Sequence, residues 1–238
     1  MPESRKQSVK DGVICVEGRE IPYRLTRSRR RTLGLSVTES GVRVNVPKWV
    51  SQTEIDRFLQ ERIRWLLRNL EKIEKNRREQ PVLSHGETVF YLGVPLQIRV
   101  APCLFPDVRR NGRTLWVSSP DEASVPDLVR AWLRERAAPL LRRRLMIHAL
   151  RQGGRIPQFG LSDARTQWGI CHPDGRIRLN WRLAQAPLSI IDYVAAHEVA
   201  HLVHADHSAR FWRQVELLHP DADTAREWLN RHGHKLMI

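Results

Sequence analysis

Short apolar runs separated by glycine-bearing turns dominate the first hundred residues. Three segments, 14–25, 32–47 and 88–100, alternate or cluster β-branched and aromatic residues in this way. That pattern is typical of strands and hairpins. Residues 1–13 are mostly polar and contain no apolar signal-peptide core, so they are expected to form a loose tail.

Two further segments repeat apolar residues at the spacing of a helix. The first, Ser51–Gln80, predicts one long amphipathic helix capped by Ser51 or Thr53. Its apolar stripe consists of Ile55, Phe58, Leu59, Ile63, Leu66, Leu67, Leu70 and Ile73. The second segment, Val125–Gln152, predicts a helix that bends near Pro139, because proline has no N–H to donate to the helical ladder.

After the turn-forming segment 152–157, the pattern changes to strands followed by helices. Two extended runs flank His172–Gly175, whose residues favour a hairpin turn. A helix with apolar residues around most of its circumference is predicted over 188–203. A second helix is expected to begin after Ser208, and a short third one to cover 224–231.

The order of these elements predicts an α+β fold. The chain has 238 residues, of which 41% are hydrophobic, and this suffices for a substantial core. We expect a polar tail over 1–13 and a β-rich and helical part over 14–154. A core over 155–238 would then combine the hairpin and its sheet with the apolar helix.

Charge and histidine are distributed unequally between these parts. Residues 1–154 contain 30 Lys and Arg against 17 Asp and Glu, whereas 155–238 contain 10 against 9. The second segment also holds eight of the ten histidines. A basic surface favours an acidic partner or nucleic acid. Since no nucleic-acid-binding motif accompanies the charge, a solvated basic surface is the preferred interpretation.

The cysteines indicate the redox environment of the protein, and the hydropathy indicates whether it spans a membrane. Cys15, Cys103 and Cys171 are odd in number and far apart, which supports neither a disulfide framework nor a cysteine zinc site. We therefore expect a reduced, cytoplasmic environment and a neutral thiol at Cys171. No apolar run approaches the length of a membrane span, so no membrane partner is expected.

The apolar helix contains the sequence His197-Glu198-Val199-Ala200-His201. Residues four apart lie one turn apart on the same helical face, so both imidazoles can reach one ion. Buried imidazoles and a buried carboxylate are costly unless they are paired or bind a metal. This H-E-x-x-H spacing is typical of zinc proteases, in which the glutamate acts as general base toward a metal-activated water.

A catalytic zinc needs a third protein ligand, and three residues are candidates. His207 follows His201 by six residues, the spacing found in H-E-x-x-H-x-x-G-x-x-H proteases, although His204 occupies the glycine position. His204 itself lies about 10 Å along a straight helix from His197, which suits a supporting role or a wall of the cleft. Glu227 would suit a distant glutamate ligand on a later helix. His207 is preferred.

Two longer stretches carry a family resemblance. The segments HEVAHLVHADHSARFW (197–212) and RTQWGICHPDGRIRLNWRLAQAP (165–187) closely resemble the YgjP-like metallopeptidase domain, a zincin family. The likeness extends over about 14–233 and includes RSRRRTLGLSVTESGVRVNVP, ERIRWLLRNL and GETVFYLGVPLQIRV. Ile170 stands where serine is usual and Asp206 where asparagine is common. The family is also similar to the SprT-type proteases, some of which act on proteins attached to DNA.

The resemblance implies a zincin-like core that holds one Zn²⁺ through His197, His201 and His207, with Glu198 catalytic. It implies a metallopeptidase that hydrolyses peptide bonds in a peptide or protein substrate. In zincins an edge strand beside the metal pairs with extended substrate, and 165–171 or 176–183 is a candidate for that strand.

Arg165, Trp168 and Asn180 are candidate cleft residues, and His204 is a candidate wall of the same cleft. The alternative is that Trp168 and Trp181 belong to the core and that Arg165 forms a structural ion pair. Phe211 and Trp212 are expected to be core anchors that fix the ligand before them.

Two other functions compete with a metallopeptidase, and each predicts different properties of the protein. A binding module with a structural zinc has no need of Glu198, since a structural site fills its fourth position with protein. A nucleic-acid-binding protein would contact its partner through the basic N-terminal part, and its affinity would fall steeply with salt. Its candidate residues are Arg27, Arg29, Arg30, Arg31, Arg142, Arg143 and Arg144.

Overall fold

The contacts of the computed structural model, which describes residues 8–16, 18–38 and 40–238, divide the chain into two compact units. The units are Met1–Arg78 and Glu79–Ile238. The α+β class is confirmed, since the described residues form six α-helices and three mixed sheets. The division expected after Gly154 falls inside the second unit, because the elements on both sides of it share one hydrophobic core.

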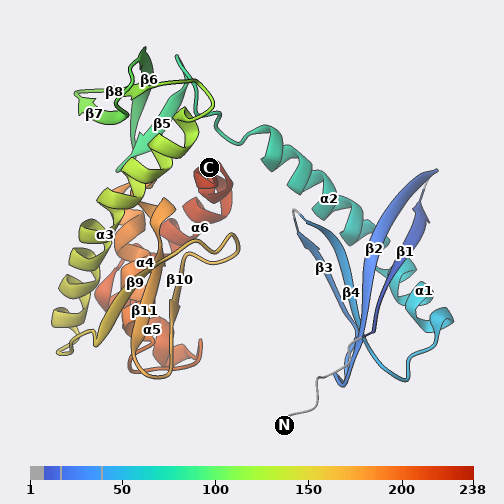
Figure 1. The fold of residues 1–238 in the computed structure, drawn as a ribbon. Helices are drawn as coiled ribbons and strands as arrows, with labels where there is room; N and C mark the ends of the chain where they lie inside the picture. Colours follow the sequence, from blue (N-terminus) through green and yellow to red (C-terminus); the bar gives the residue numbers. More distant parts are fainter. Residues whose placement is uncertain (1–7, 17, 39) are drawn as a thin grey trace, which may run out of the picture. The chain divides into compact units, whose positions relative to one another are not determined.

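The first unit is a four-stranded sheet with two helices (Figure 1). Its strand order is β1-β2-β4-β3, in which β2 and β4 run parallel and the outer pairs antiparallel. The strands are β1 (Ser8–Val16), β2 (Arg19–Ser28), β3 (Gly34–Thr38) and β4 (Gly41–Pro47). Alternate residues such as Tyr23 and Leu25 are buried on the face that packs against the helices.

The first strand corrects the expected polar tail. Residues 8–13 belong to β1, which pairs with β2 along its whole length, while 1–7 lie outside the described residues. Among the described strands it pairs with β2 alone, and Val9 and Val13 are exposed on it. An edge strand needs few buried apolar side chains, so its sequence resembles that of a polar tail.

The predicted long helix is two helices, α1 (Gln52–Glu61) and α2 (Ile63–Arg78). Ser51 caps α1 in a full capping box with Glu54, as one of the two predicted N-caps. The break lies at Arg62, whose backbone N–H bonds back to the last turn of α1. Neither proline nor glycine marks this break, and the apolar stripe continues across it.

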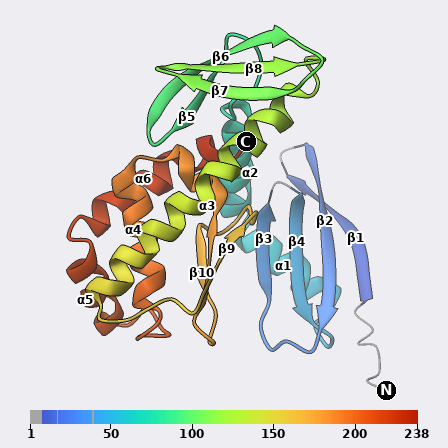
Figure 2. The same ribbon diagram turned by 60° about the vertical axis from the view of Figure 1, so that its left-hand side comes forward.

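The second unit begins with another four-stranded sheet, of order β5-β6-β8-β7. Its strands are β5 (Thr88–Tyr91), β6 (Val94–Pro102), β7 (Asp107–Asn111) and β8 (Thr114–Ser119). The long helix α3 (Val125–Arg151) follows, with Pro139 inside it. Helix α3 packs along α4 (Leu188–Ala200), as Figures 1 and 2 show.

A three-stranded sheet of order β10-β11-β9 lies beside α4. Its strands are β9 (Gln158–Ser162), β10 (Gly169–Cys171) and β11 (Arg176–Asn180). Strands β10 and β11 form the predicted hairpin, and β10 is an edge strand. The chain continues through the 3₁₀ helix η1 (Trp181–Gln185), α4, α5 (Ala209–Leu218), α6 (Ala222–His232) and η2 (Gly233–Leu236). Among the described residues, no helix has the length and apolar character needed to cross a membrane.

Candidate metal centre

Helix α4 and the turn after it bring three histidines together. His197 lies in the last turn of α4 and His201 is its C-cap residue, so the two imidazoles are one turn apart. The chain then turns back, and His207 immediately precedes Ser208, the N-cap of α5. One nitrogen from each of the three rings lies within 4.8 Å of the others.

The spacing of these nitrogens matches a metal-binding site. The Nε2 atoms of His197 and His207 are 3.3 Å apart. Two imidazole nitrogens bound tetrahedrally to one zinc ion, at 2.0–2.1 Å each, would be separated by about the same distance. A catalytic zinc ion has three protein ligands and keeps its fourth position open for water or substrate. The three imidazoles present here therefore fit the ion that the resemblance implies.

Hydrogen bonding and burial favour the neutral, ligand-ready form of His197 and His201. His201 Nδ1 lies 3.0 Å from the backbone oxygen of His204, an acceptor, so Nδ1 carries the proton and Nε2 is left free. Burial, reinforced by the charges of His201 and His207, lowers the pKa of His197 to about 4. Burial likewise lowers the pKa of His201.

Phe211 forms an apolar floor beneath the three rings. It is fully buried, and its ring centroid lies 4.4 Å from that of His201, in a stacked arrangement. The centroids of His197 and His207 lie 4.9 and 4.8 Å from it. Trp212 contacts His197 and His207 from the next position. These contacts agree with the expectation that both residues anchor the ligand before them.

Glu198 is the buried acid of the site. It is only 5% exposed, and burial raises the pKa of its carboxyl group to about 8. The backbone N–H of Cys171, in the edge strand β10, donates a hydrogen bond to the carboxylate. A buried carboxyl group of this kind is suited to receive and release a proton.

A cleft of about 380 Å³ opens onto these groups. Glu198 and all three histidines line it, together with Ala205. Its other wall is β10 with its flanking residues: Gln167, Gly169, Ile170, Cys171, His172 and Pro173. The cleft therefore places the acid, the three imidazoles and an edge strand around one space.

The outer edge of β10 faces this cleft. The backbone oxygen of Trp168 accepts a hydrogen bond from the backbone N–H of Asn180. The backbone N–H of His172 donates to the backbone oxygen of Arg176, so these two residues pair with β11. In an antiparallel ladder the intervening residues 169 and 171 direct their N–H and C=O groups to the opposite side. The bond from Cys171 to Glu198 follows that direction.

The sequence-based substrate residues lie in different environments. Asn180 is fully buried, and its side-chain amide donates to the backbone oxygens of Ala164 and Gln167. Its side chain thus organises the loop before β10. Trp168 is half-buried, and its indole packs against Gly233 and the core. Of the described residues, neither these two nor Arg165 are among those that line the cleft.

Of the described residues, neither alternative ligand belongs to the converging group, and His204 is not among those that line the cleft. Glu227 is exposed on α6 and pairs with Arg231. His204 contributes its backbone oxygen to His201, which matches the supporting role considered for it.

Burial raises the pKa of the Cys171 thiol to about 11, with further contributions from Glu198 and Asp174. A neutral thiol at Cys171 agrees with the expectation.

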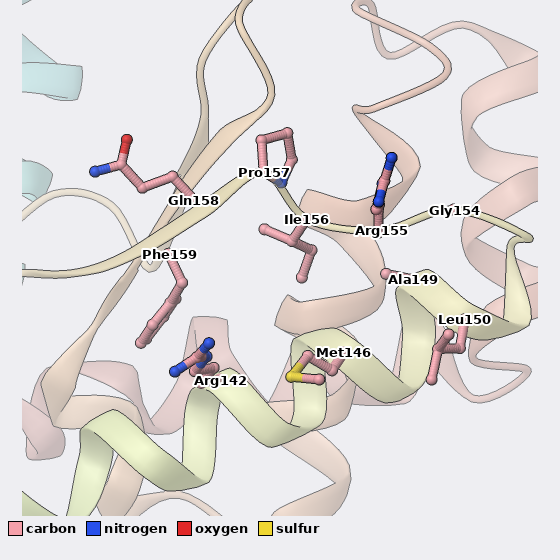
Figure 3. Close-up of a pocket in the computed structure, with 10 residues that line it drawn as sticks. All are labelled: Arg142, Met146, Ala149, Leu150, Gly154, Arg155, Ile156, Pro157, Gln158 and Phe159. Atoms are coloured by element: carbon pink, nitrogen blue, oxygen red, sulfur yellow. The ribbon is translucent and has the colours of Figure 1, made fainter.

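A second cavity, of about 410 Å³, lies between the end of α3 and the start of β9 (Figure 3). Met146, Ile156 and Phe159 supply apolar surface, and Arg142 and Arg155 supply charge. Among the described residues that line it there is no acid, histidine, cysteine or hydroxyl group. Of these two cavities, the histidine cleft is therefore the one lined by groups capable of proton transfer or metal binding.

The fold and the cleft together have the parts of a metal-dependent hydrolase. The profile of a family described as YgjP-like, metallopeptidase domain, matches residues 31–232. The match covers most of the chain, and the chain belongs to this family. No curated protein and no solved structure matches it at a significant level. Membership makes it a metallopeptidase, a hydrolase that uses a metal ion and acts on peptide or protein substrates.

The sequence included Gly169 and Cys171 in a candidate substrate strand, but it did not indicate that both residues contact Glu198. A glycine inside a strand pattern is a signal for the close approach of another group. The sequence alone, however, does not say which group approaches.

Proposed function

We propose that this protein is a zinc-dependent endopeptidase with a zincin-like core. The observation that carries the proposal is the convergence of three imidazole nitrogens within 4.8 Å, beside the buried carboxyl group of Glu198. His197, His201 and His207 would hold one Zn²⁺. When bound, zinc supplies Lewis acidity that polarises the scissile carbonyl and lowers the pKa of water.

Glu198 would act as the general base and then as the acid. Its carboxylate takes a proton from the attacking water and later delivers that proton to the leaving amine. The surrounding residues support this role by burial, which excludes bulk water from the carboxyl group. Phe211 would keep the three imidazoles in place during turnover.

Strand β10 would bind the substrate main chain. An extended peptide added to its outer edge forms backbone hydrogen bonds that orient the scissile bond. The N–H of Cys171 already donates to Glu198. The groups left for substrate are thus both backbone groups of Gly169 and the C=O of Cys171. Short pairing of this kind suits an unfolded protein segment without a long recognition sequence.

The two competing functions have less support. A purely structural zinc gives no reason for Glu198 to lie buried beside the cluster. For nucleic acid binding, Arg144 is already occupied by Asp192, and Arg27 donates to the backbone oxygen of Val50. The three free cysteines are consistent with a reduced, cytoplasmic setting, which we keep as part of the proposal.

The test is hydrolysis of fluorescein-labelled casein by zinc-loaded protein, with Glu198→Gln as the matched variant. Loss of general-base catalysis costs roughly 10²- to 10⁴-fold in rate. We expect casein cleavage by the wild type, loss of that magnitude in Glu198→Gln, and equal zinc content in both. Wild-type turnover in the zinc-loaded variant would refute the general-base role.

A further inference from the structure

Gly169 in β10 touches the carboxyl group of Glu198 so closely that a side chain does not fit between them. A Cβ atom at this position would lie 2.5 Å from Oε1 of Glu198 and 2.6 Å from both Cδ and Cγ. Carbon atoms in contact are normally separated by about 3.5–4.0 Å. The whole end of the Glu198 side chain would have to move to accept even alanine.

The requirement at Gly169 is for space, since its backbone does not adopt the left-handed conformation that favours glycine. Gly160 provides a comparison in β9 of the same sheet. A Cβ at Gly160 would lie 3.7 Å from the nearest atom, in the side chain of Arg178, which is ordinary contact. Two glycines in one small sheet therefore differ sharply in what an added methyl group would displace.

The Glu198 side chain has little freedom to move away from Gly169. It is 5% exposed and belongs to a helix whose neighbouring residues Val199 and Ala200 are fully buried. The amide of Cys171, two residues beyond Gly169, holds the carboxylate by a hydrogen bond. Strand β10 thus contacts the same carboxyl group at two alternate residues, once by close packing and once by donation.

We propose that Gly169 is a positioning residue, which together with the Cys171 amide forms a cradle that fixes the orientation of the Glu198 carboxylate. The role rests on the proposed function of Glu198, and it extends that function to a residue with no side chain of its own. The edge strand then serves two partners at once, because the same Gly169 carries backbone groups available to substrate. The spacing between the peptide and the base is set by one strand.

The test compares Gly169→Ala with Gly160→Ala, in full-length protein loaded with zinc. A displacement of about 1 Å in a catalytic group can cost about 100-fold in rate. We expect Gly169→Ala to remain folded with one zinc per chain, to melt at a lower temperature than the wild type because the added methyl group overpacks a buried site, and to lose about 100-fold in casein hydrolysis. Gly160→Ala should retain wild-type hydrolysis. Near-wild-type hydrolysis by Gly169→Ala would overturn the proposal.

A second readout does not depend on activity. Labelling with ¹⁵N-cysteine gives three amide signals, because the chain has three cysteines, and Cys171→Ala assigns the relevant one. In zinc-free protein, Gly169→Ala should shift the Cys171 amide signal, and in a Glu198→Ala background the same change should have little effect. An equal shift in both backgrounds would show that Gly169 does not act through Glu198, and would overturn the cradle.

The two readouts separate the cradle from the proposed function. If zinc-loaded wild type fails to cleave casein while the amide shift depends on Glu198, the cradle stands and the proposed hydrolysis fails. If casein is cleaved but the amide shift is independent of Glu198, the hydrolysis stands and the cradle fails.

Discussion

Helix α4 contributes to two clusters of polar side chains that differ in how their atoms are satisfied. Asp192, near the start of the helix, accepts hydrogen bonds from Arg144 and lies 3.4 Å from His148 Nε2, both on α3. Five residues later, His197 meets two other imidazoles, and its Nδ1 has no hydrogen-bond partner in the described part of the chain. In the first cluster the opposite charges of Arg144 and Asp192 are paired within the protein, whereas in the second three imidazole nitrogens converge on a point between them.

This difference separates a structural cluster from a candidate site. Burial alone does not make the distinction, because His148 is also buried with an unpaired Nδ1. At Asp192 opposite charges face each other, and the pair links α3 to α4. At His197 three like donors face each other with no anion between them. Three imidazole nitrogens that converge in this way have the ligand arrangement of a zinc site, and this is why the second cluster points to a metal.

The largest effect is expected when one of the converging imidazoles is removed. His207→Ala should weaken zinc binding by more than the roughly 100-fold that loss of an outer-sphere partner costs. Glu227→Ala is the matched control, since Glu227 pairs with Arg231 and is not a member of the converging group. Zinc affinity is measured by competition with a chromogenic chelator. Equal weakening by both substitutions would contradict the three-histidine assignment.

Asp192→Asn should affect stability and leave zinc binding unchanged. The substitution removes a charged partner from Arg144, whose side chain is mostly buried, and should cost about 1–3 kcal/mol in the free energy of unfolding. Urea unfolding of the zinc-free protein measures this cost. Asp223→Asn, which breaks an exposed pair with Arg226, is the control and should cost less than about 1 kcal/mol. Loss of zinc binding in Asp192→Asn would show that the histidine cluster depends on Asp192, and would contradict the separation of the two clusters.

The Asp192 contribution should depend on pH. Burial alone would raise the pKa of this carboxyl group, but hydrogen bonds from His148 and Arg144 outweigh it and lower the pKa below its ordinary 3.8. The charge of Asp192 also acts on His219. A lowered folded pKa gives stability that is present above the unfolded pKa and is lost as the pH falls through the folded one. The difference between wild type and Asp192→Asn should shrink from pH 6 to pH 3; a constant difference would contradict this account.

The smallest effect is expected in the first unit, which contains neither cluster. Ser51→Ala removes the capping box of α1 and should cost about 1 kcal/mol, because an N–H at the helix start loses its acceptor. Zinc content and casein hydrolysis should be unchanged. A loss of hydrolysis in this variant would show that the first unit supports the site.

Local patterns predicted most of the elements that build the site. The helix periodicity and the H-E-x-x-H spacing placed two imidazoles on one face of α4, and the His172–Gly175 turn predicted the β10–β11 hairpin. Strands β7 and β8 were missed, although Asn111-Gly112 between them is a common hairpin turn. Strand β9 was missed as well, because it is short and pairs with a strand distant in sequence.

Long-range packing accounts for what the sequence did not predict within the site. Asn180 was a candidate cleft residue, but its bonds to the loop at Ala164 and Gln167 exist only once that loop folds against β11. The close approach of Gly169 to Glu198 likewise depends on how β10 packs against α4. Spacing along the chain identifies residues on one element, whereas contacts between elements require the fold.

The most direct test of the central claim is zinc analysis of the wild-type protein, followed by X-ray absorption spectroscopy of the bound metal. We predict one zinc per chain, with nitrogen and oxygen neighbours at about 2.0–2.1 Å that include three imidazoles. Protein that binds no zinc after reconstitution, or a sulfur neighbour at about 2.3 Å, would contradict the assignment to His197, His201 and His207.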